Sequence, residues 1–320
     1  MPPRSPLPPR HGLAAAWLRT PDRDPTQTPP WATIRDFLVA RLTPIGAEGV
    51  DRQFAAAGFV DEAGQPWRGD EPYRPNTFIW FHRELREEPV VPSTEDILYR
   101  DDRIVVADKP HFLSTIPRGR HVVQSLVVRL RNRLDLPELG PAHRLDRLTA
   151  GVVLLTTEKR WRGAYQGLFE RREVAKTYRA IAPFDPGLTL PRRLRGHIVK
   201  RRGSLQAELI AGAPDNASTT LELVRVLDSP AGRWADYRLT PETGRTHQLR
   251  VQLNALGLPI LGDPLYPDVL DVDVDDFSTP LRLLAESLSF IDPIEGTARR
   301  FVSHRELDGP PASPRPEATD

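Results

Sequence analysis

The sequence predicts a protein of mixed α and β structure, with a small N-terminal module in front of a larger domain. With 320 residues, 39% of them hydrophobic, the chain is longer than most single domains and has enough apolar side chains for a sizeable core. Apolar residues recur at helical spacing between 34 and 57, and short β-rich runs follow. Further strand-like runs and amphipathic segments occupy the chain from residue 95 onward.

Composition narrows the class of protein. The formal net charge is +1, so charge alone does not indicate a nucleic-acid partner. Most positive charge is arginine, which suits phosphate binding, although a genome-level codon bias toward Arg, Ala and Pro explains most of this excess. The sequence has no cysteine and no apolar run long enough to span a bilayer. We therefore expect a soluble cytoplasmic protein without disulfides or thiolate metal sites.

Proline and charge mark the segments that we expect to lie outside the domains. Residues 1–30 are rich in proline and arginine, interrupted by one apolar patch at Leu13–Leu18, and predict a disordered arm with at most one ordered turn. Residues 84–94 mix acids with prolines and predict a linker. Residues 308–320 are rich in proline and acids and predict a disordered tail.

The small module is expected over residues 31–83. Ile34, Phe37 and Leu38 fall at helical spacing, a second short helix is expected at Val50–Ala57, and two short strands follow around a turn. Two helices followed by a small sheet resemble an S4-type RNA-binding module. A plain structural cap on the main domain explains the same pattern, because the basic helix face of an S4 module is poorly developed.

The large domain is expected over residues 95–307. Two strand-like runs surround the turn at Asp101-Asp102-Arg103, and the second run ends at Lys109. Residues 122–134 predict an amphipathic helix with arginines on its exposed side, where a solvated face is the default interpretation. Lys109 either approaches an RNA phosphate or pairs with a neighbouring acid.

The central motif is a lone carboxylate between two arginines. From Pro141 to Gly151 the chain reads Pro-Ala-His-Arg-Leu-Asp-Arg-Leu-Thr-Ala-Gly, and a β-branched apolar run follows at once. Taken alone, Asp146 between Arg144 and Arg147 is explained by ion pairing. The whole motif, however, resembles the central motif of the RluA-type pseudouridine synthases, in which the aspartate is the catalytic nucleophile.

Two further motifs agree with this resemblance, in the same order along the chain. A predicted strand at 173–181 carries Lys-Thr-Tyr, and its alternation puts Lys176 and Tyr178 on one face. Residues 240–253 read Thr-Pro-Glu-Thr-Gly-Arg-Thr-His-Gln-Leu-Arg-Val-Gln-Leu, and Pro-Ile-Leu-Gly-Asp-Pro-Leu-Tyr follows at 259–266. Leu284 and Gln252 stand where the family commonly has histidines, which weakens any transfer of substrate specificity.

The resemblance implies an α+β fold with a long mixed, mostly antiparallel central sheet flanked by helices, and it implies roles for several residues. Asp146 would be the nucleophile, and Arg250 would pair with it. Tyr178 would stack on the target base and help the final deprotonation at C5. Arg245 would lie in the same pocket, whereas His247 is expected to support its loop and not to act as a general base. No metal or cofactor is implied.

Charge clusters suggest how RNA would be bound. Residues 190–203 are strongly basic with few acids, so they create a local field that attracts a polyanion, although a basic loop without a partner is the alternative. Residues 268–276 form an acidic insertion that either repels phosphate or is inert variation. The expected RNA-binding residues are Arg144, Arg147, Lys109, Lys176, Arg245, His247, Arg192, Arg193, Arg195, Lys200, Arg201 and Arg202.

The resemblance therefore predicts a pseudouridine synthase that isomerises a specific uridine in structured rRNA or tRNA by base flipping, as a monomer, which is the family default. By the same resemblance, Arg144 would enter the space that the flipped base leaves. The alternative is a non-catalytic RNA-binding or ribosome-assembly factor that retains the fold.

Overall fold

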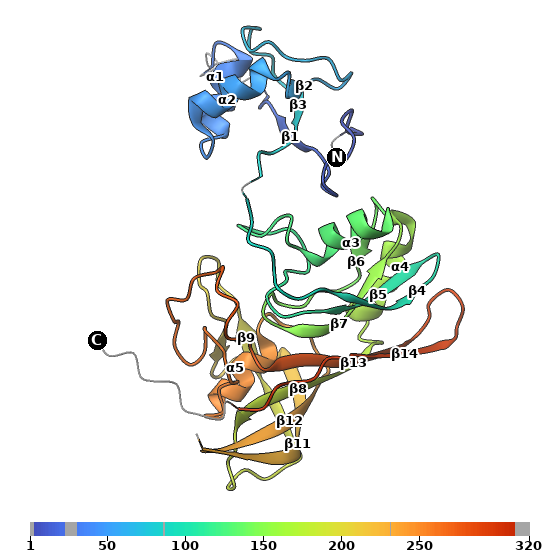
Figure 1. The fold of residues 1–320 in the computed structure, drawn as a ribbon, viewed down its shortest axis with the longest axis vertical. Coiled ribbons are helices and arrows are strands. Elements are labelled where there is room, and N and C mark those ends of the chain that lie inside the picture. The colour runs from blue at the N-terminus through green and yellow to red at the C-terminus, as the bar shows by residue number, and fades with distance from the viewer. Residues whose placement is uncertain (1–2, 23–30, 86, 231, 311–320) are drawn as a thin grey trace. The chain divides into compact units, whose positions relative to one another are not determined.

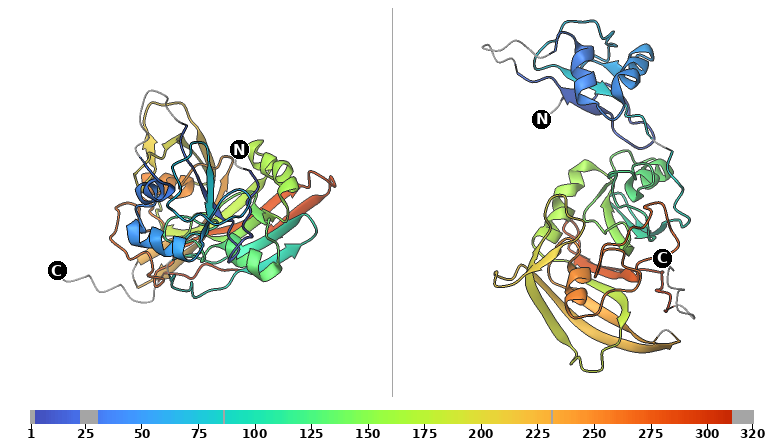
Figure 2. Two further views of the ribbon diagram at one scale, coloured as in Figure 1. Left: turned by 90° about the horizontal axis from the view of Figure 1, so that it is seen from above. Right: turned by 90° about the vertical axis from the view of Figure 1, so that its left-hand side faces the viewer.

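The computed structural model describes residues 3–22, 31–85, 87–230 and 232–310 (Figures 1 and 2). The chain divides into two compact units, Met1–Glu87 and Glu88–Asp320. The division falls within the predicted linker 84–94. Within the described residues no helix is long and apolar enough to cross a membrane.

The N-terminal unit packs two helices on one face of a three-stranded antiparallel sheet, in the order β1-β3-β2. Its elements are β1 (Ala16–Arg19), α1 (Ile34–Arg41), α2 (Gly46–Ala55), β2 (Phe59–Val60) and β3 (Phe78–Phe81). Thr33 and Asp36 form a capping box that starts α1, since each side chain accepts the backbone N–H of the other.

Strand β1 corrects the prediction of a disordered arm over residues 1–30. Ala16 and Leu18 face the helices, while Trp17 and Arg19 point the other way, and the whole strand pairs with β3. This alternation and the ladder of backbone hydrogen bonds outweigh the proline-rich surroundings. Residues 1–2 and 23–30 of the predicted arm lie outside the described residues, as do residues 311–320 of the predicted tail.

The second unit is built on an eleven-stranded sheet, whose main path runs β10-β9-β11-β12-β8-β13-β7-β5-β4, with β14 paired to β13 and β6 to β7. The elements are β4 (Asp96–Arg100), β5 (Ile104–Lys109), α3 (Leu126–Leu134), β6 (Gly140–Pro141), β7 (Ala150–Thr156), the 3₁₀ turn Lys159–Trp161, α4 (Arg162–Glu170), β8 (Ala175–Pro183), β9 (Arg192–Val199), β10 (Glu208–Ile210), β11 (Ala217–Ser229), β12 (Gly232–Pro241), α5 (Gln248–Ala255), β13 (Leu283–Ile291) and β14 (Ala298–Val302). Among the strands of the described residues, only β13 and β7 pair in parallel. The predicted α+β class with a mixed, mostly antiparallel sheet is confirmed.

Helix α3 is shorter at its start than predicted. Residues 122–124 donate their backbone N–H groups to the carboxylate of Glu88, at 2.8–2.9 Å, instead of entering the helix. A carboxylate from the predicted linker therefore satisfies the donors that precede the helix.

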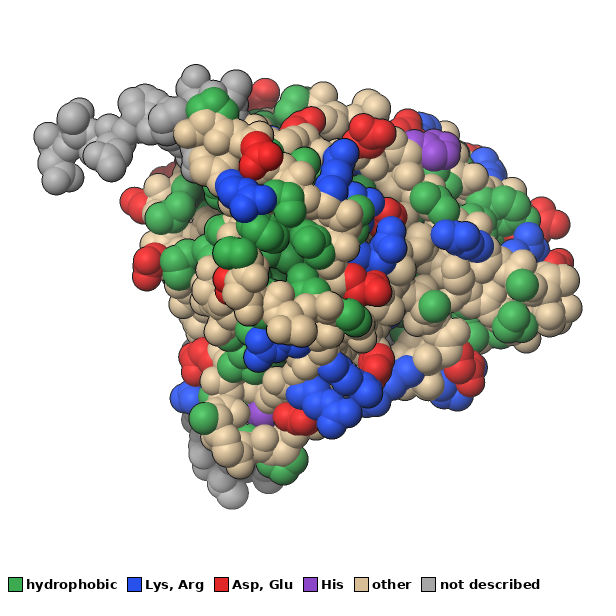
Figure 3. Space-filling model, turned by 90° about the horizontal axis from the view of Figure 1, so that it is seen from below, with side chains coloured by type: hydrophobic (Ala, Val, Ile, Leu, Met, Phe, Trp, Pro, Cys, Tyr) green, Lys and Arg blue, Asp and Glu red, His purple; other side chains and the backbone are tan. Residues whose placement is uncertain are grey.

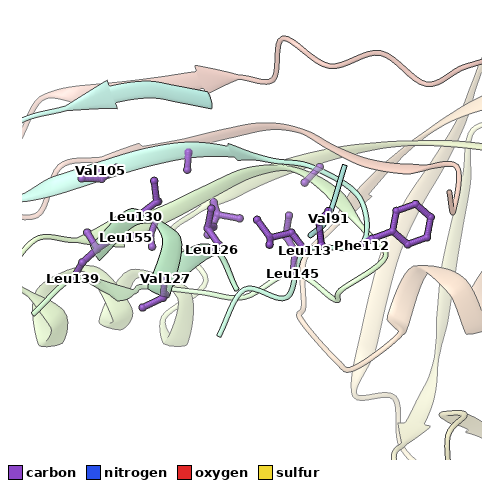
Figure 4. Packing of buried hydrophobic residues seen from close by; sticks show 13 residues of the cluster. Val91, Val105, Phe112, Leu113, Leu126, Val127, Leu130, Leu139, Leu145 and Leu155 are labelled. Carbon is purple, nitrogen blue, oxygen red and sulfur yellow. The ribbon is translucent and has the colours of Figure 1, made fainter. Parts of the chain in front are cut away.

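Helices cover both faces of β5 and of β7, the strand that follows the Asp146 loop. Val105 and Leu155 face Leu126 and Leu130 of α3, as Figure 4 shows, whereas the alternate residues of β5 and β7 face α4. Helix α5 packs in a separate cluster against β8, β9, β11 and β12. Leu148 and Tyr178 contact both the α3 cluster and the α5 cluster, so the chain between β6 and β7 lies where the two cores meet.

The parallel junction of β7 and β13 requires glycine. Gly151 has φ +112°, and a Cβ built there would lie 2.2 Å from the carbonyl oxygen of Ala285. The close backbone approach brings the strand after Asp146 against β13.

Candidate active site

The three sequence motifs meet in one cavity of about 750 Å³. Its walls come from the loop between β6 and β7, from β8 and from the turn between β12 and α5. The lining includes Asp146, Tyr178, Lys176, Arg245, His247 and Arg250. Residues as far apart in the chain as Asp146 and Arg250 thus line the same cavity.

The loop that carries Asp146 is held by its backbone. Thr115 Oγ1 donates to the Leu145 carbonyl at 2.8 Å and accepts the Leu145 N–H at 3.1 Å. His111 Nδ1 lies 2.7 Å from the Leu148 carbonyl. The carbonyls of Leu145 and Leu148, which flank Asp146 in the chain, are therefore both in contact with side chains of another segment. These contacts hold the backbone that carries the Asp146 carboxylate.

Lys109 belongs to this support, and its predicted contact with RNA is wrong. The side chain is completely buried, and Nζ donates to the carbonyls of Pro110, Leu113 and Arg147 at 3.1, 2.7 and 3.3 Å. Burial lowers the pKa of Lys109 to about 7, while the nearby Asp146 acts in the opposite direction. A phosphate cannot reach an amine in this position.

Arg250 is fixed by a buried partner. Its Nε and Nη2 donate to the two oxygens of Asp263 at 2.7 and 2.5 Å, and both side chains are buried. Burial is the largest single influence and disfavours the charged guanidinium, but the hydrogen bonds to Asp263, together with the negative charges of Asp263 and Asp146, raise the pKa of Arg250. Its free Nη1 lies 3.8 Å from Asp146 Oδ2, so the predicted pairing is present at this distance. Asp263 was not singled out from the sequence, although it stands in the quoted Leu-Gly-Asp motif.

His247 lies on the same side of the carboxylate. Its Nε2 is 3.9 Å from Asp146 Oδ2, and its Nδ1 is 3.1 Å from the hydroxyl of Tyr266. Burial lowers the pKa of His247 to about 4, which keeps the imidazole neutral at neutral pH. Tyr266, the last residue of the quoted motif, was also given no role from the sequence.

The turn before α5 is organised by Gln248. Its side-chain oxygen accepts the hydroxyl of Thr243 at 2.7 Å and the N–H of Arg245 at 3.0 Å, and its amide nitrogen donates to Ser218 O and Thr219 Oγ1. All four contacts of the amide are used inside the protein. They set the path by which the motif enters α5.

Tyr178 reaches the cavity from β8. The strand places it between Ala285 of β13 and Leu239 of β12 in register, and the ring packs on both cores. Burial raises the pKa of the Tyr178 hydroxyl, and the charge of Asp146 raises it further. The phenol is therefore neutral and presents a half-buried ring beside the carboxylate.

The basic residues around the cavity differ in whether hydrogen bonds within the protein hold their side chains. Arg144 is exposed at the rim. Lys176 Nζ donates to the Thr243 carbonyl at 3.2 Å, and Arg245 Nε donates to Asn216 O at 3.2 Å. Arg147 also lines the cavity, and it donates to the carbonyls of Phe112 and Val274, which ties the acidic insertion to the loop that carries Asp146.

The basic segment 190–203 lies outside the cavity lining, on β9 and the turn after it. Part of its charge is used locally: Arg193 hydrogen bonds with Glu242, Arg201 lies 3.5 Å from Glu208, and Lys200 donates to the Ser204 carbonyl. Arg192, Arg195 and Arg202 are exposed. On the face of the second unit shown in Figure 3, Lys and Arg side chains gather in a patch.

His143 lines the cavity and was not expected there. Its Nε2 accepts the N–H of Leu154 at 3.1 Å, and its ring stacks on Phe169 with centroids 4.4 Å apart. Burial lowers the pKa of His143 to about 3. Within the described part of the chain, no three His, Asp or Glu side chains are grouped so that they could hold a metal ion.

Comparison with known proteins gives consistent matches. A family model described as RNA pseudouridylate synthase matches residues 103–255. The chain is 30% identical over 224 residues to the dual-specificity RNA pseudouridine synthase RluA of Yersinia pestis, covering 66% of this chain and 99% of that protein. It is 33% identical over 223 residues to the protein of the same name from Haemophilus ducreyi, covering 67% of this chain and 94% of that protein.

Two solved human structures share the fold. RNA pseudouridylate synthase domain containing 1 superposes with a TM-score of 0.54 at 24% identity, over 68% of this chain and 86% of that one. RNA pseudouridylate synthase domain containing 4 superposes with a TM-score of 0.50 at 26% identity, over 66% of this chain and 88% of that one.

Proposed function

This chain belongs to the RluA family of RNA pseudouridine synthases and is an RNA-modifying isomerase, and from this premise we propose that Asp146 is its covalent nucleophile. The supporting observation is convergence. Asp146, Tyr178 and Arg250 come from three distant segments and line one cavity, and Arg250 Nη1 lies 3.8 Å from Asp146 Oδ2.

The proposed reaction conserves atoms and electrons without a co-substrate. One carboxylate oxygen of Asp146 bonds to C1′ of the ribose, while the electron pair of the C1′–N1 bond leaves with the uracil. The uracil anion turns, C5 bonds to C1′, and the carboxylate departs with its electron pair. Loss of the C5 proton and protonation of N1 complete the isomer. Initial addition of the carboxylate to C6 is the alternative chemistry for the same residue.

Arg250 and Tyr178 have distinct proposed roles. The buried guanidinium, itself fixed by Asp263, attracts the attacking carboxylate and orients it. The neutral Tyr178 ring stacks on the freed base and limits its movement while it turns. The raised pKa of Tyr178 favours stacking over action as the base that removes the C5 proton.

RNA enters this proposal through the exposed arginines. A uridine in folded RNA must leave the stack to reach Asp146, at a cost of about a few kcal/mol, and the proposed role of the exposed Arg144 is to fill the vacated space. Arg192, Arg195 and Arg202 provide a basic surface for the backbone. The relatives are named as dual-specificity enzymes, and we propose structured rRNA or tRNA as the substrate class of this chain as well.

The N-terminal unit, the oligomeric state and the cellular location complete the proposal. The helices and sheet of residues 16–81 are proposed to contact RNA in the manner of an S4-like module, with a structural cap as the alternative. The chain is proposed to act as a cytoplasmic monomer.

The test is release of tritium from RNA labelled at uridine C5, because that hydrogen leaves only when C5 becomes the glycosidic carbon. The substrate is RNA from cells that lack the gene, and pseudouridine mapping with and without the gene identifies the target uridine. Tritium release by the purified chain supports the proposal. RNA binding without tritium release would instead support a non-catalytic assembly factor that retains the fold.

A further inference from the structure

His247 adopts a backbone conformation that a histidine rarely takes. At φ +56° it lies in the left-handed region, where a side chain costs about 1–2 kcal/mol, and its carbonyl accepts the first hydrogen bond of α5, from Val251 N–H at 2.9 Å. A glycine or asparagine would fit this cap position with less strain. Strain of this kind at a cavity wall indicates that the side chain has a use there.

The position of the imidazole shows what that use is. The ring is only 11% exposed, with one nitrogen toward Asp146 and the other toward Tyr266. The sequence places His247 among the expected RNA-binding residues and predicts that it supports its loop. In the structure it lies between the proposed nucleophile and a buried hydroxyl.

Asp146 and Tyr266 both bear on which nitrogen of His247 carries the proton. The Tyr266 hydroxyl accepts the Ala207 N–H at 2.6 Å and donates to Ala207 O at 3.1 Å, and its oxygen also lies 3.1 Å from His247 Nδ1, a contact in which either group can donate. When the hydroxyl turns its proton to Nδ1, Nε2 carries the hydrogen on the side of Asp146. The opposite tautomer would aim the Nε2 lone pair at a carboxylate, which is unfavourable.

Both nearby donors approach the same oxygen. Arg250 Nη1 and His247 Nε2 lie 3.8 and 3.9 Å from Asp146 Oδ2. Catalytic contacts tighten when substrate binds, and a shift of the carboxylate that shortens both distances would let Oδ2 accept hydrogen bonds from both groups. Oδ1 would then be the carboxylate oxygen that neither donor engages.

We propose that His247 is a positioning residue that, together with Arg250, holds Oδ2 of Asp146, so that Oδ1 is the oxygen that forms the covalent bond. This inference rests on the proposed function of Asp146. It holds whether the bond forms to C1′ or to C6. The charged groups nearest the imidazole are Asp146, Arg250, Lys200 and Asp263, and the low pKa of His247 agrees with a neutral donor in their midst.

The experiment compares single-turnover rates and affinities of His247 variants on a transcript that spans the mapped uridine. His247→Asn is the main variant, because asparagine tolerates the left-handed backbone but is too short to reach Asp146. We expect its rate to fall about 100-fold while its affinity for the transcript changes less than about twofold. His247→Gln restores an N–H donor of similar reach and should recover the rate to within about tenfold of the unmodified protein. His304→Gln, at an exposed histidine, is the matched control and should leave both quantities unchanged.

The tautomer is tested separately with Tyr266→Phe. Removal of the hydroxyl frees the imidazole to adopt either tautomer, so the rate should fall about tenfold with affinity preserved. Thermal unfolding of every variant shows whether it is folded.

Three results would overturn the inference. A folded His247→Asn variant with the unmodified rate would show that His247 does not position Asp146. A loss of affinity that accounts for the loss of rate would make His247 an RNA contact. An unchanged rate in a folded Tyr266→Phe variant would remove the basis for the tautomer. If the unmodified protein itself releases no tritium, it is the proposed function that fails.

Discussion

The position of the Asp146 carboxylate depends in part on Asp263, a residue outside the cavity lining. Asp263 fixes Arg250 through two hydrogen bonds, and Arg250 in turn faces Asp146. A buried ion pair of this kind adds little stability compared with an apolar pair, but removal of one partner leaves an unpaired buried charge. The site therefore depends on Asp263 for both folding and orientation.

Asp263→Asn should lower the free energy of unfolding by about 3–5 kcal/mol, because the buried guanidinium of Arg250 loses its countercharge. The measurement is urea unfolding at neutral pH. Asp308→Asn removes a carboxylate that is 81% exposed and pairs with Arg282, so this control should change the free energy by less than about 1 kcal/mol. Equal effects of the two substitutions would contradict the buried-pair argument.

Three histidines around the site make stability depend on pH. Burial lowers the pKa of His143 to about 3 and the pKa values of His111 and His247 to about 4. The unfolded chain therefore takes up protons below its histidine pKa of about 6.5 that the folded protein does not. Stability is complete above that pH and falls as the pH decreases toward about 4.

Urea unfolding at about pH 7 and about pH 5 should show this loss, at roughly 1.4 kcal/mol per histidine for each pH unit within the window. His111→Asn keeps a donor near the Leu148 carbonyl but removes the titrating group, so it should reduce the loss. His304→Gln, at an exposed position, should not reduce it. Greater stability at the lower pH would show that the histidines are not buried as neutral groups.

At the residue scale, the sequence predicted the side chains of the site that stand in the family motifs and line the cavity. Asp146, Tyr178 and Arg250 stand in motifs that resemble the family, and the structure brings them together. The assignment of Lys109 to RNA was wrong, since a positive residue beside a motif has the same sequence signature whether it binds phosphate or backbone carbonyls. Only the fold distinguishes these cases.

At the scale of elements, the most constrained contact is the one between β7 and β13. Gly151→Ala would place a Cβ 2.2 Å from the Ala285 carbonyl oxygen, in a backbone region that disfavours side chains. Gly232 has nearly the same φ, +113°, but open space where its Cβ would lie. A comparison of alanine substitutions at these two glycines therefore separates two contributions to the free energy of unfolding: the atomic overlap, present only at Gly151, and the unfavourable backbone conformation, present at both.

Gly151→Ala should therefore lower the free energy of unfolding by at least about 2 kcal/mol more than Gly232→Ala. It should also reduce activity, because Asp146 lies directly before this strand. Urea unfolding and tritium release are the measurements. Equal destabilisation by the two substitutions would mean that β7 and β13 move apart without cost.

The elements that the sequence misjudged share one physical cause. Strand β1 and the start of α3 are both decided by partners distant in the chain: β3 pairs with β1, and Glu88 takes the N–H groups before α3. Local composition and periodicity carry no information about such partners. The sheet order, with β13 between β8 and β7, likewise depends on pairing between distant segments, and the sequence did not predict it.

At the scale of the whole molecule, a near-zero net charge is reconciled with an RNA substrate by uneven distribution. Exposed arginines lie on β9 and the turn after it, while the insertion after residue 267 is acidic. Each arginine that contacts a phosphate releases counterions from the RNA, so affinity should fall with salt.

Arg195→Gln should reduce the slope of log affinity against log salt concentration by about 0.7–0.9. Arg160→Gln removes the same charge from a residue paired with Glu158, away from the cavity lining, and should leave the slope unchanged. Filter binding of the mapped transcript over a range of salt concentrations gives both slopes. Identical slopes for the two variants and the unmodified protein would exclude Arg195 from the RNA interface.

The proposed reaction depends on Asp146 acting as a covalent nucleophile, and the substitution Asp146→Asn tests this role most directly. The substitution keeps the shape of the side chain and removes the negative charge that must attack. In a single-turnover assay with the mapped transcript, we predict that this variant binds RNA with affinity within about twofold of the unmodified protein and releases no tritium above background. Tritium release by Asp146→Asn at a rate near that of the unmodified protein would contradict the assignment.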